Sequence, residues 1–329
     1  MMKLSTMKKV IDTVDRDWKS PLAERILERW GYDEGTVFCF RASANFIFMF
    51  KRAGKSYFLR FNDSCEKELK QIESELQIVQ YLQDSSLKVS RPVKSNNENY
   101  IEVVNTESGT YYAVVFEALQ GKQYEMEEIN NEQIFRWGSS LGELHQTLKC
   151  LPDDLQKNRP NWQDHLYKME ELLYPSETAA YREVEKLSKW AEGLRVTKEN
   201  YGIIHYDFEL DNVMFENNTL GVLDFDDCSN YWYVADIVYA LRGIEHFNVN
   251  NSVIKIFIEG YESETMLDRS ILNEASGFVR MHHVVSLAKL TRAVDVAAST
   301  THPEWLTHLH KKLSERIKFY RDSIGKVQN

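Results

Sequence analysis

Residues 201–227 read Y-G-I-I-H-Y-D-F-E-L-D-N-V-M-F-E-N-N-T-L-G-V-L-D-F-D-D, and they carry most of the information about this chain. Apolar runs at 203–204 and 213–215 flank a polar loop, and another apolar run at 220–223 follows the turn signal Asn217-Asn218. Short apolar runs bounded by turn residues are typical of β-strands. The stretch therefore predicts a strand, a polar loop and a β-hairpin.

The polar loop and the hairpin exit hold the residue types that phosphoryl transfer requires. His205, Asp207 and Asn212 have the H-x-D-x-x-x-x-N spacing of a kinase catalytic loop, and the D-F-D triplet that begins at Asp224 stands where kinases carry a metal-binding D-F-G. The reaction needs a carboxylate that accepts the proton of the acceptor hydroxyl, and oxygen ligands that hold Mg²⁺ against the phosphates. Asp207 is the predicted base, and Asn212 and Asp224 are the predicted metal ligands. Asp and Asn are also common in turns, but the order and spacing favour the kinase interpretation.

On these residues the stretch resembles the aminoglycoside phosphotransferase and choline kinase family, whose members are relatives of the protein kinases and mostly phosphorylate small molecules. The family signature is H-G-D-x-x-x-x-N followed by D-[FW]-[DE]; Asp226 matches the last position, and Tyr206 replaces the usual glycine. The resemblance implies a structural role for His205, Asp226 and Asp236, the last of which opens a helix and binds the catalytic loop in the family. His145 is expected to pack beneath that loop.

The resemblance implies an α+β, two-lobed protein-kinase-like fold. A small lobe with an antiparallel sheet and one main helix is expected at residues 1–120, and a larger, mainly helical lobe at 121–329. The residue pattern agrees with this order, because strands rich in aromatic and β-branched residues come first and amphipathic helices follow. The expected elements of the small lobe are strands near 36–40, 46–50, 57–59, 100–104 and 111–116 and a helix at 67–82. A helix capped by Ser20, with Pro21 at its first position, precedes them.

Nucleotide-binding residues are expected in the small lobe. The turn that ends at Asn45 takes the place of the phosphate-covering loop and contains no glycine; Ser43 and Asn45 are implied phosphate contacts, although an ordinary hairpin turn explains the pattern equally well. Arg60 takes the position of the lysine that binds phosphates in protein kinases. Glu75 is the implied partner glutamate on the following helix, with Glu73 as the alternative.

Two further expectations concern the ligands. The backbone of the segment from Glu117 to Leu119 is implied to bind the adenine edge as a hinge. Inserted helices at 162–173 and 179–194 are expected to shape the acceptor pocket, as such insertions do in the family. The consecutive aromatic residues at 231–233 suggest a cage for a cationic acceptor, but three adjacent residues do not share one face of a helix or strand.

Composition narrows the function classes. The chain has 329 residues, of which 43% are hydrophobic and 12% aromatic, as expected of a folded globular protein. Its 40 Lys and Arg residues against 50 Asp and Glu residues give a net charge of −10, which disfavours nucleic acid as a partner. The acidic balance suits a cationic acceptor, and solubility explains it equally well.

The cysteines and the hydropathy pattern predict a cytoplasmic protein without a membrane partner. The four cysteines have no C-x-x-C spacing, so neither a zinc site nor a disulfide framework is indicated. The first ten residues are basic and lack an apolar core, and no apolar run approaches membrane-spanning length. The cysteines are Cys39, Cys65, Cys150 and Cys228.

The sequence thus predicts an ATP- and Mg²⁺-dependent phosphotransferase that moves the γ-phosphoryl group to a hydroxyl of a small molecule such as an amino sugar or an amino alcohol. A protein Ser/Thr kinase of the bacterial stress-response type is one alternative, disfavoured because no A-P-E segment follows Asp224. A catalytically idle kinase-like scaffold is the other. Tyr206 and the glycine-free turn favour the scaffold, whereas retention of Asp207 and both metal ligands opposes it.

Overall fold

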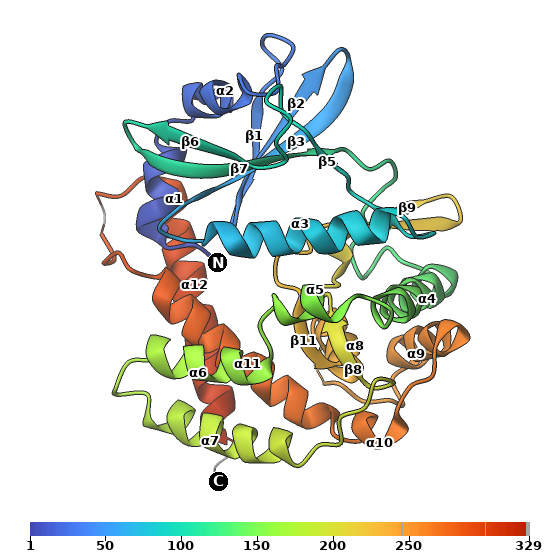
Figure 1. The fold of residues 1–329 in the computed structure, drawn as a ribbon. Helices are drawn as coiled ribbons and strands as arrows, with labels where there is room; N and C mark the ends of the chain where they lie inside the picture. The colour runs from blue at the N-terminus through green and yellow to red at the C-terminus, as the bar shows by residue number, and fades with distance from the viewer. Residues whose placement is uncertain (245, 300, 327–329) are drawn as a thin grey trace. The chain divides into compact units, whose positions relative to one another are not determined.

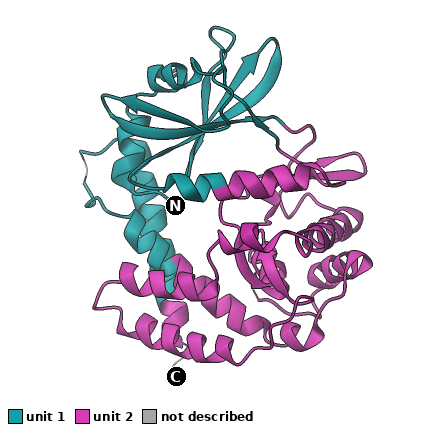
Figure 2. Ribbon diagram, in the orientation of Figure 1, with its two compact units in different colours: residues 1–73, 91–118, 287–321 teal, residues 74–90, 119–286, 322–329 magenta. Residues whose placement is uncertain are grey.

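The computed structural model describes residues 1–244, 246–299 and 301–326, which divide into two compact units (Figures 1 and 2). Unit 1 comprises residues 1–73, 91–118 and 287–321, drawn in teal in Figure 2. Unit 2 comprises residues 74–90, 119–286 and the chain from 322 onward, drawn in magenta. The lobe boundary expected at residue 120 stays a prediction.

Unit 1 is built around an antiparallel sheet whose strands follow the order β1-β2-β3-β7-β5, with β6 paired to β7. Alternation along β2 separates its two faces, because Phe46, Phe48 and Phe50 are buried while Met49 and Lys51 are exposed. The five expected strands of this sheet are confirmed, and the short β5 was not predicted. The strands are β1 (Phe38–Ala42), β2 (Phe46–Arg52), β3 (Lys55–Asp63), β5 (Pro92–Val93), β6 (Glu102–Thr106) and β7 (Gly109–Glu117).

Helices α1 (Leu4–Ile11) and α2 (Pro21–Leu27) bury apolar side chains in the same core as the phenylalanines of β2, together with residues of α12 (Glu304–Lys326). The predicted cap of α2 is confirmed, because the Ser20 side chain accepts a hydrogen bond from the Ala23 N–H and Pro21 takes the first helical position. The helix expected at 67–82 is α3 (Leu69–Gln83), which begins in unit 1 and continues into unit 2.

Unit 2 is mainly helical and contains two small sheets. In one, β10 pairs with β9 antiparallel and with β4 parallel; in the other, β11 pairs with β8 antiparallel. The predicted strand, loop and hairpin are confirmed as β8, a one-turn 3₁₀ helix (η1) and the β9–β10 hairpin, whereas β4 and β11 were not predicted. The strands and the turn are β4 (Lys88–Val89), β8 (Tyr201–Ile204), η1 (Leu210–Asn212), β9 (Val213–Glu216), β10 (Thr219–Val222) and β11 (Ser229–Trp232).

The helices of unit 2 surround these strands. The two inserted helices are confirmed as α6 and α7. The helices are α4 (Asn131–Leu148), α5 (Asp153–Lys157), α6 (Trp162–Leu172), α7 (Thr178–Glu192), α8 (Tyr233–Ala240), α9 (Ser252–Glu264), α10 (Arg269–Leu272) and α11 (Ala275–Ala293), of which α11 continues into unit 1.

Glycines let α4 and α9 pack backbone against backbone. A Cβ atom on Gly138 of α4 would lie 1.9 Å from the carbonyl oxygen of Phe257, and one on Gly260 of α9 would lie 2.0 Å from the carbonyl oxygen of Phe135. The Trp137 ring packs edge to face on the Phe257 ring, with ring centroids 4.9 Å apart. Trp137 also donates its indole N–H to the carbonyl of Phe208 at 3.1 Å, which ties α4 to the catalytic loop.

The aromatic-cage hypothesis is wrong, because Tyr231, Trp232 and Tyr233 are all buried in the core of unit 2 and are closed to a ligand. Within the described ranges, no helix combines the length and the apolar character that a bilayer crossing requires.

Candidate functional site

His205 joins the catalytic loop to the hairpin exit. Its Nε2 atom lies 2.9 Å from the carbonyl oxygen of Leu223, the residue before Asp224, and its Nδ1 atom accepts the backbone N–H of Asp207 at 3.3 Å. Because a carbonyl only accepts hydrogen bonds, Nε2 carries the ring proton. The imidazole is fully buried, so it serves the shape of the loop.

Asp236 anchors the start of the loop from below. This buried carboxylate, in the first turn of α8, accepts the backbone N–H groups of His205 at 2.7 Å and of Tyr206 at 2.8 Å. His145 of α4 lies beneath it, with its Nε2 atom 3.0 Å from the carboxylate. Buried carboxylates are stable only when their oxygens are paired, and here each oxygen has at least one partner.

Asn212 binds Asp207 directly. The amide nitrogen of Asn212 donates to both the backbone carbonyl and the Oδ2 atom of Asp207, each at 2.9 Å. Because a carbonyl cannot donate, the NH₂ side of the amide must face Asp207, and the amide oxygen faces away. Asn212 is therefore oriented to offer an oxygen ligand to a cation while it holds the carboxylate of Asp207 in place.

Asp224 follows β10, and the residue before it, Leu223, is hydrogen-bonded through both its N–H and its carbonyl. The N–H of Leu223 donates to the carbonyl of Asn212 at 2.9 Å, and the carbonyl of Leu223 accepts a hydrogen bond from the His205 ring. Leu223 therefore connects Asn212 with Asp224, the two predicted metal ligands. Asp224 adopts a φ of +57°, an uncommon value for a residue with a side chain. Such values cluster at functional sites, where surrounding bonds hold them.

Carboxylate and amide oxygens are the ligand types that Mg²⁺ prefers, and the ion usually keeps only one or two protein ligands beside phosphates and water. The pair Asn212 and Asp224 fits that requirement. Over the described part of the chain, no three His, Cys, Asp or Glu side chains converge as a self-sufficient metal site. A cation bound here would therefore need the oxygens of a nucleotide to complete its shell.

Arg242 lies beside the predicted base and was missed by the sequence reasoning. Its Nη2 atom donates to the Oδ1 atom of Asp207 and to the Oε2 atom of Glu209. Burial acts to lower the pKa of Arg242, but the charges of the two carboxylates outweigh it and raise that pKa above its ordinary value. Burial also raises the pKa of Glu209, against the opposing effect of Arg242. The available signal was an arginine two residues past α8, a helix in which Asp236 alone is charged.

Arg159 is a second missed residue, and it holds the segment that follows Asp224. Its guanidinium donates to the backbone carbonyls of Asp226 and Cys228, the latter at 2.8 Å, and to the Ser74 hydroxyl at 3.1 Å. The side chain is buried, so these bonds replace water contacts that the charge would otherwise keep. Nothing in the sequence around Arg159 marks it, because its partners lie 67 and more residues away.

Tyr206 shows how the loop accommodates a residue other than glycine. Its backbone has a φ of +73°, in the left-handed region that glycine adopts at little cost. Its ring is buried, with centroid distances of 5.2 Å to His165, 5.5 Å to Tyr231 and 5.0 Å to Tyr239. The loop thus keeps a glycine-like backbone, and the ring fills a space between α6, β11 and α8.

The residues expected to bind phosphate in unit 1 lie on the first hairpin and on β3. Asn45 is buried and its Oδ1 atom accepts the Asn62 amide at 2.8 Å, which fastens the β1–β2 turn to β3. Ser43 is bound within the same turn, because its N–H donates to the carbonyl of Asn45 at 3.1 Å. Arg60 is buried with its guanidinium 5.0 Å from the ring centre of Phe116.

An apolar strip lies on the same face of the sheet as Arg60. Met49 is opposite Phe58, and Ile47 is opposite Arg60, so the alternation of the strands puts these side chains on one face. Phe40 extends the strip, with its ring 5.3 Å from that of Phe58. Phe40 is 59% exposed and Met49 38% exposed, so part of this apolar face is accessible to a ligand.

The remaining predicted residues lie on α3 and on the segment after β7. Glu75 is 1% exposed whereas Glu73 is exposed, which favours Glu75 over the alternative. Glu117 ends β7 and its N–H donates to the carbonyl of Arg91 at 2.9 Å. The Leu119 side chain packs on Gly221 of β10 in unit 2.

Hydrogen bonds therefore connect one group of the predicted site residues. His205, Asp207, Asn212, Asp224 and Asp236 form a continuous hydrogen-bonded set in unit 2, in which Asp224 enters through its neighbour Leu223. Asp226 is held at its carbonyl by Arg159, and Glu75 and Leu119 belong to the same unit. The residues Ser43, Asn45, Arg60 and Glu117 belong to unit 1.

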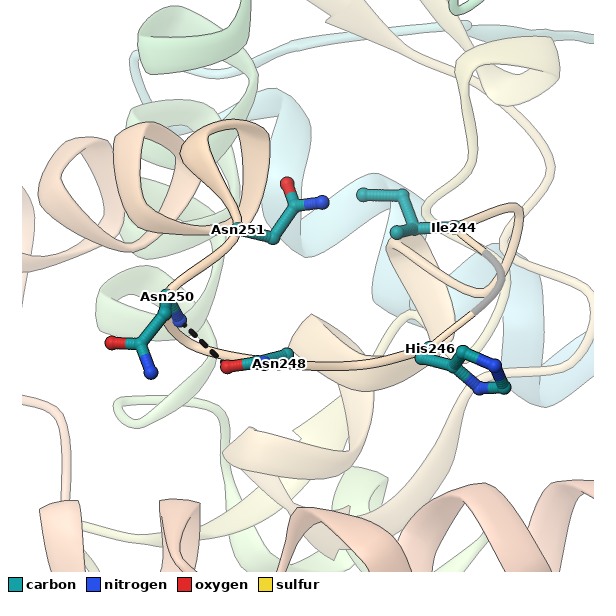
Figure 3. A pocket seen from close by; sticks show the side chains of 5 residues that line it. All are labelled: Ile244, His246, Asn248, Asn250 and Asn251. Carbon is teal, nitrogen blue, oxygen red and sulfur yellow. Dashed lines mark hydrogen bonds between the residues drawn. The ribbon is translucent and has the colours of Figure 1, made fainter.

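A pocket of about 420 Å³ opens in the loop between α8 and α9 (Figure 3). Its lining consists of three asparagines, one isoleucine and one histidine, and it begins two residues after Arg242. Figure 3 shows the Asn251 amide and the Ile244 side chain pointing toward each other across it. The N–H of Asn250 donates to the Asn248 side chain at 2.9 Å, which shapes the rim. The lining residues are Ile244, His246, Asn248, Asn250 and Asn251.

Comparison with known proteins agrees with this geometry. A family model described as the phosphotransferase enzyme family matches residues 41–270. The amicoumacin kinase of Bacillus subtilis (strain 168) is 20% identical over 280 residues, which cover 82% of this chain and 83% of that protein.

Solved structures show the same fold. An amicoumacin kinase in complex with AMP-PNP, Ca²⁺ and Ami has a TM-score of 0.77 at 20% identity, with 96% of each chain covered. A microcompartment-associated aminopropanol kinase has a TM-score of 0.66 at 21% identity, over 92% of this chain and 98% of that one. A spectinomycin phosphotransferase in complex with ADP and spectinomycin has a TM-score of 0.63 at 15% identity, over 92% and 93%. The predicted kinase-like fold is confirmed.

Proposed function

Since this chain belongs to the phosphotransferase enzyme family, we propose that it transfers the γ-phosphoryl group of ATP, with Mg²⁺, to a hydroxyl of a small molecule. The observation that carries the proposal is the pair of hydrogen bonds by which Asn212 orients Asp207. That arrangement combines a positioned carboxylate with an outward-facing amide oxygen, as phosphoryl transfer requires. The complexes of similar proteins with AMP-PNP and Ca²⁺, and with ADP, support a nucleotide and a divalent cation as ligands.

The residues of the catalytic loop have different proposed roles. Asp207 orients the acceptor hydroxyl and receives its proton on a carboxylate oxygen. The amide oxygen of Asn212 and the carboxylate of Asp224 would hold Mg²⁺, which supplies positive charge against the phosphates when bound. His205 and Asp236 keep the backbone of the loop in shape through the bonds described above. Positioning of this kind is the main source of catalysis in phosphoryl transfer, because the reaction asks for little covalent chemistry from the protein.

Residues of unit 1 would bind the nucleotide. Arg60 offers a guanidinium to phosphate oxygens, and the apolar strip formed by Phe40, Met49 and Phe58 suits the flat face of an adenine ring. The turn that ends at Asn45 would cover the phosphates through its backbone N–H groups. Glu75 and Leu119, which belong to unit 2, and Glu117 are proposed as further nucleotide-binding residues, with the backbone from Glu117 to Leu119 at the adenine edge.

The acceptor is proposed to be a hydroxyl compound that carries an amine. The catalytic loop places the carboxylates of Asp207 and Glu209 against the cation Arg242, so the local charge is negative and favours a cationic ligand. The asparagine-lined pocket beside the α8–α9 loop would add neutral hydrogen-bonding groups, which suit an acceptor rich in hydroxyls. The similarity to an aminopropanol kinase and to an amicoumacin kinase supports this class of acceptor.

The proposal is tested by ADP release with a panel of amino sugars and amino alcohols. With an accepted substrate, Asp207→Asn should lower kcat by roughly 10²- to 10⁴-fold, the usual contribution of a general base. Asp211→Asn is the matched control, because Asp211 is an exposed carboxylate of the same loop and should retain activity. Absence of both ADP release and Mg²⁺-dependent ATP binding in the wild-type chain would refute the proposal.

Two further assays on the same protein test the alternative functions. A kinase of protein Ser/Thr residues would phosphorylate a generic protein substrate, and Asp207→Asn would abolish the signal. An idle scaffold would show no rise in melting temperature with ATP and Mg²⁺, whereas a binder gains stability as the ligand concentration rises. The intact bonding of Asp207 to Asn212 favours the active enzyme over the scaffold.

A further inference from the structure

One arginine pairs with two carboxylates of the catalytic loop. The Nη2 atom of Arg242 donates to Oδ1 of Asp207 and to Oε2 of Glu209, so both of its hydrogens are used. The two carboxylates are close in sequence, whereas Arg242 lies 35 residues beyond Asp207. The side chains of Asp207 and Glu209 are 34% and 33% exposed, so the proposed base is accessible to an acceptor.

Arg242 and Asn212 hold the two oxygens of Asp207. Asn212 donates its amide N–H to Oδ2 at 2.9 Å, and Arg242 donates to Oδ1. The terminal torsion of an aspartate side chain is otherwise broad, so a bond to each oxygen limits the rotation of the carboxylate. A general base must be oriented toward the proton that it accepts. Arg242 is therefore placed to orient the base as well as to pair with its charge.

Glu209 competes with Asp207 for the same nitrogen. An arginine beside one carboxylate commonly forms two parallel bonds to it. A second bond from Arg242 to Asp207 would compete with Asn212 for Oδ2, and both forks of a guanidinium include Nη2. Here Nη2 is shared with Glu209, and Asp207 accepts Arg242 on Oδ1 and Asn212 on Oδ2. Glu209 thus limits how closely Arg242 pairs with the base.

The charges of the three side chains lead to the same result. With both carboxylates ionised and the guanidinium protonated, the group carries a net charge of −1. Arg242 and Asp207 alone would form a neutral pair, which attracts the proton of a hydroxyl less strongly than a negative group does. The second carboxylate, that of Glu209, therefore keeps the surroundings of the base negative.

Helix α8 supports both the backbone and the side chain of the base. Asp236, in the first turn of α8, accepts the N–H groups of His205 at 2.7 Å and of Tyr206 at 2.8 Å. Arg242 lies two residues past the end of α8 and binds the Asp207 side chain. The helix that fixes the backbone of the loop therefore also places the guanidinium.

We propose that Arg242 and Glu209 are a coupled positioning pair for the base. Arg242 orients Asp207 through Oδ1, and Glu209 prevents Arg242 from closing on both oxygens of Asp207 and neutralising it. Glu209 therefore acts on the base only through Arg242. Asp207 is the base of the proposed reaction, so this role rests on the proposed function. The competing explanation is an ion pair that contributes to folding alone.

A double-mutant cycle on the full chain tests the coupling. ADP release is measured at saturating ATP, Mg²⁺ and the acceptor that gives the highest rate in the panel of amino sugars and amino alcohols. The proteins are wild type, Arg242→Gln, Glu209→Gln and the double variant. We expect each single variant to lower kcat by about tenfold or more, the size of a charge-assisted hydrogen bond.

The background decides the effect of Glu209→Gln. In the Arg242→Gln background it should change kcat little, because no guanidinium is left to close on Asp207. The KM for ATP should stay unchanged in each variant, because the pair acts on the base and not on the nucleotide. A pair that contributes to folding alone predicts the same effect of Glu209→Gln in both backgrounds.

Arg242→Lys is the conservative variant. Arg242 uses one nitrogen for both carboxylates, and a lysine ammonium also carries several N–H donors on one nitrogen. The kcat of Arg242→Lys should therefore lie between those of wild type and Arg242→Gln.

Arg136 and Glu132 of α4 provide the matched control pair. Nη2 of Arg136 donates to Glu132 at 2.6 Å, and 27% of the Arg136 side chain is exposed, close to the 24% of Arg242. Arg136→Gln and Glu132→Gln should both retain the kcat of wild type. Circular dichroism and melting temperature verify the fold of every variant.

A crystal structure of Glu209→Gln provides a readout that needs no turnover. In this variant Arg242 should form two bonds to Asp207, and the bond from Asn212 to Oδ2 should lengthen or be lost. An unmoved Arg242 with the bond from Asn212 intact would contradict the proposal.

The kinetic outcomes are equally distinct. An equal loss of kcat from Glu209→Gln in both backgrounds, or no loss in either, overturns the coupling. A raised KM for the acceptor with unchanged kcat also overturns it, because Glu209 would then bind the acceptor directly. If wild type releases no ADP with any acceptor, the proposed function fails, and the crystal structure of Glu209→Gln still decides whether Glu209 holds Arg242 away from Asp207.

Discussion

Tyr206 donates its backbone N–H to the Oδ1 atom of Asp236 at 2.8 Å while it holds a φ of +73°. The bond fixes the residue directly before Asp207 in a backbone conformation that costs a side-chain-bearing residue about 1–2 kcal/mol. The buried Tyr206 ring offsets this strain by its contacts with His165, Tyr231 and Tyr239. The orientation of the base therefore depends on a strained residue whose side chain is part of the core.

Replacement of Tyr206 by glycine should destabilise the protein although it relieves the backbone. Loss of a buried aromatic side chain costs about 3–5 kcal/mol, which exceeds the gain of about 1–2 kcal/mol from the relieved φ. We expect Tyr206→Gly to lower the free energy of unfolding by about 2 kcal/mol or more, and Tyr206→Phe to lower it by less. Urea denaturation measures both.

Asn217 offers the matched control for that experiment. It also has a positive φ, +50°, but lies exposed in the β9–β10 turn with no ring to lose. Asn217→Gly should be neutral or slightly stabilising. An equal effect of glycine at both positions would show that the Tyr206 ring contributes nothing to stability.

The close packing of α4 on α9 predicts a large effect of one methyl group. Gly138→Ala should destabilise the protein by about 1–3 kcal/mol or more, because the new Cβ would lie 1.9 Å from the carbonyl oxygen of Phe257 and the helices must separate. Gly325→Ala in α12 is the control, since a Cβ there meets no atom within 4 Å and alanine is the better helix former by up to about 1 kcal/mol. Thermal denaturation of both variants distinguishes packing from helix propensity. A stabilising Gly138→Ala would contradict the described packing.

Two glutamates of α3 should differ in their effect on nucleotide use. Glu75 is buried and Glu73, two residues earlier on the same helix, is exposed. We expect Glu75→Gln to lower kcat/KM for ATP by roughly 10- to 100-fold, the range of a lost hydrogen bond to a charged group, and Glu73→Gln to change it little. Steady-state kinetics with varied ATP provides the comparison. Similar kinetics of the two variants would remove Glu75 from the nucleotide site.

The Lys9–Asp63 pair predicts a pH dependence of stability. Burial acts to raise the pKa of Asp63, but the N–H of Cys65 and the Lys9 ammonium outweigh it, so the folded pKa lies below the ordinary value of 3.8. A group with a lowered folded pKa contributes stability above its ordinary pKa and loses it as the pH falls through the folded value. Asp63→Asn should therefore lower the free energy of unfolding at pH 7 by about 1–3 kcal/mol, and the difference from wild type should shrink below pH 3.8.

Urea denaturation at pH 7 and at pH 3 measures this difference. Glu185→Gln is the control, because Glu185 pairs with Lys189 on the exposed face of α7 and such pairs contribute little. A difference between Asp63→Asn and wild type that stays constant from pH 7 to pH 3 would show that the charge of Asp63 is not the source of its contribution.

The local sequence pattern was sufficient to predict the helices and strands that bury one regular face or begin with a capping residue. The helix that begins after Ser20, the alternating strand from Phe46 and the hairpin after Asn212 all appear where the sequence places them. The strand β11 was not predicted, because its residues are buried by pairing with β8, and nothing in residues 229–232 alone distinguishes a strand from a loop. Pairing partners that are distant in the chain decide such segments.

The sequence by itself determined the family, the fold class and the order of chemical groups in the catalytic loop, because these depend on residue type and spacing over short distances. Only the tertiary structure decided how that loop is held. Arg242 reaches Asp207 over 35 residues, and Arg159 reaches the carbonyl of Asp226 over 67. Contacts of this range depend on how separate helices and strands close on one another, and a pattern that repeats every two or four residues carries no information about that closure.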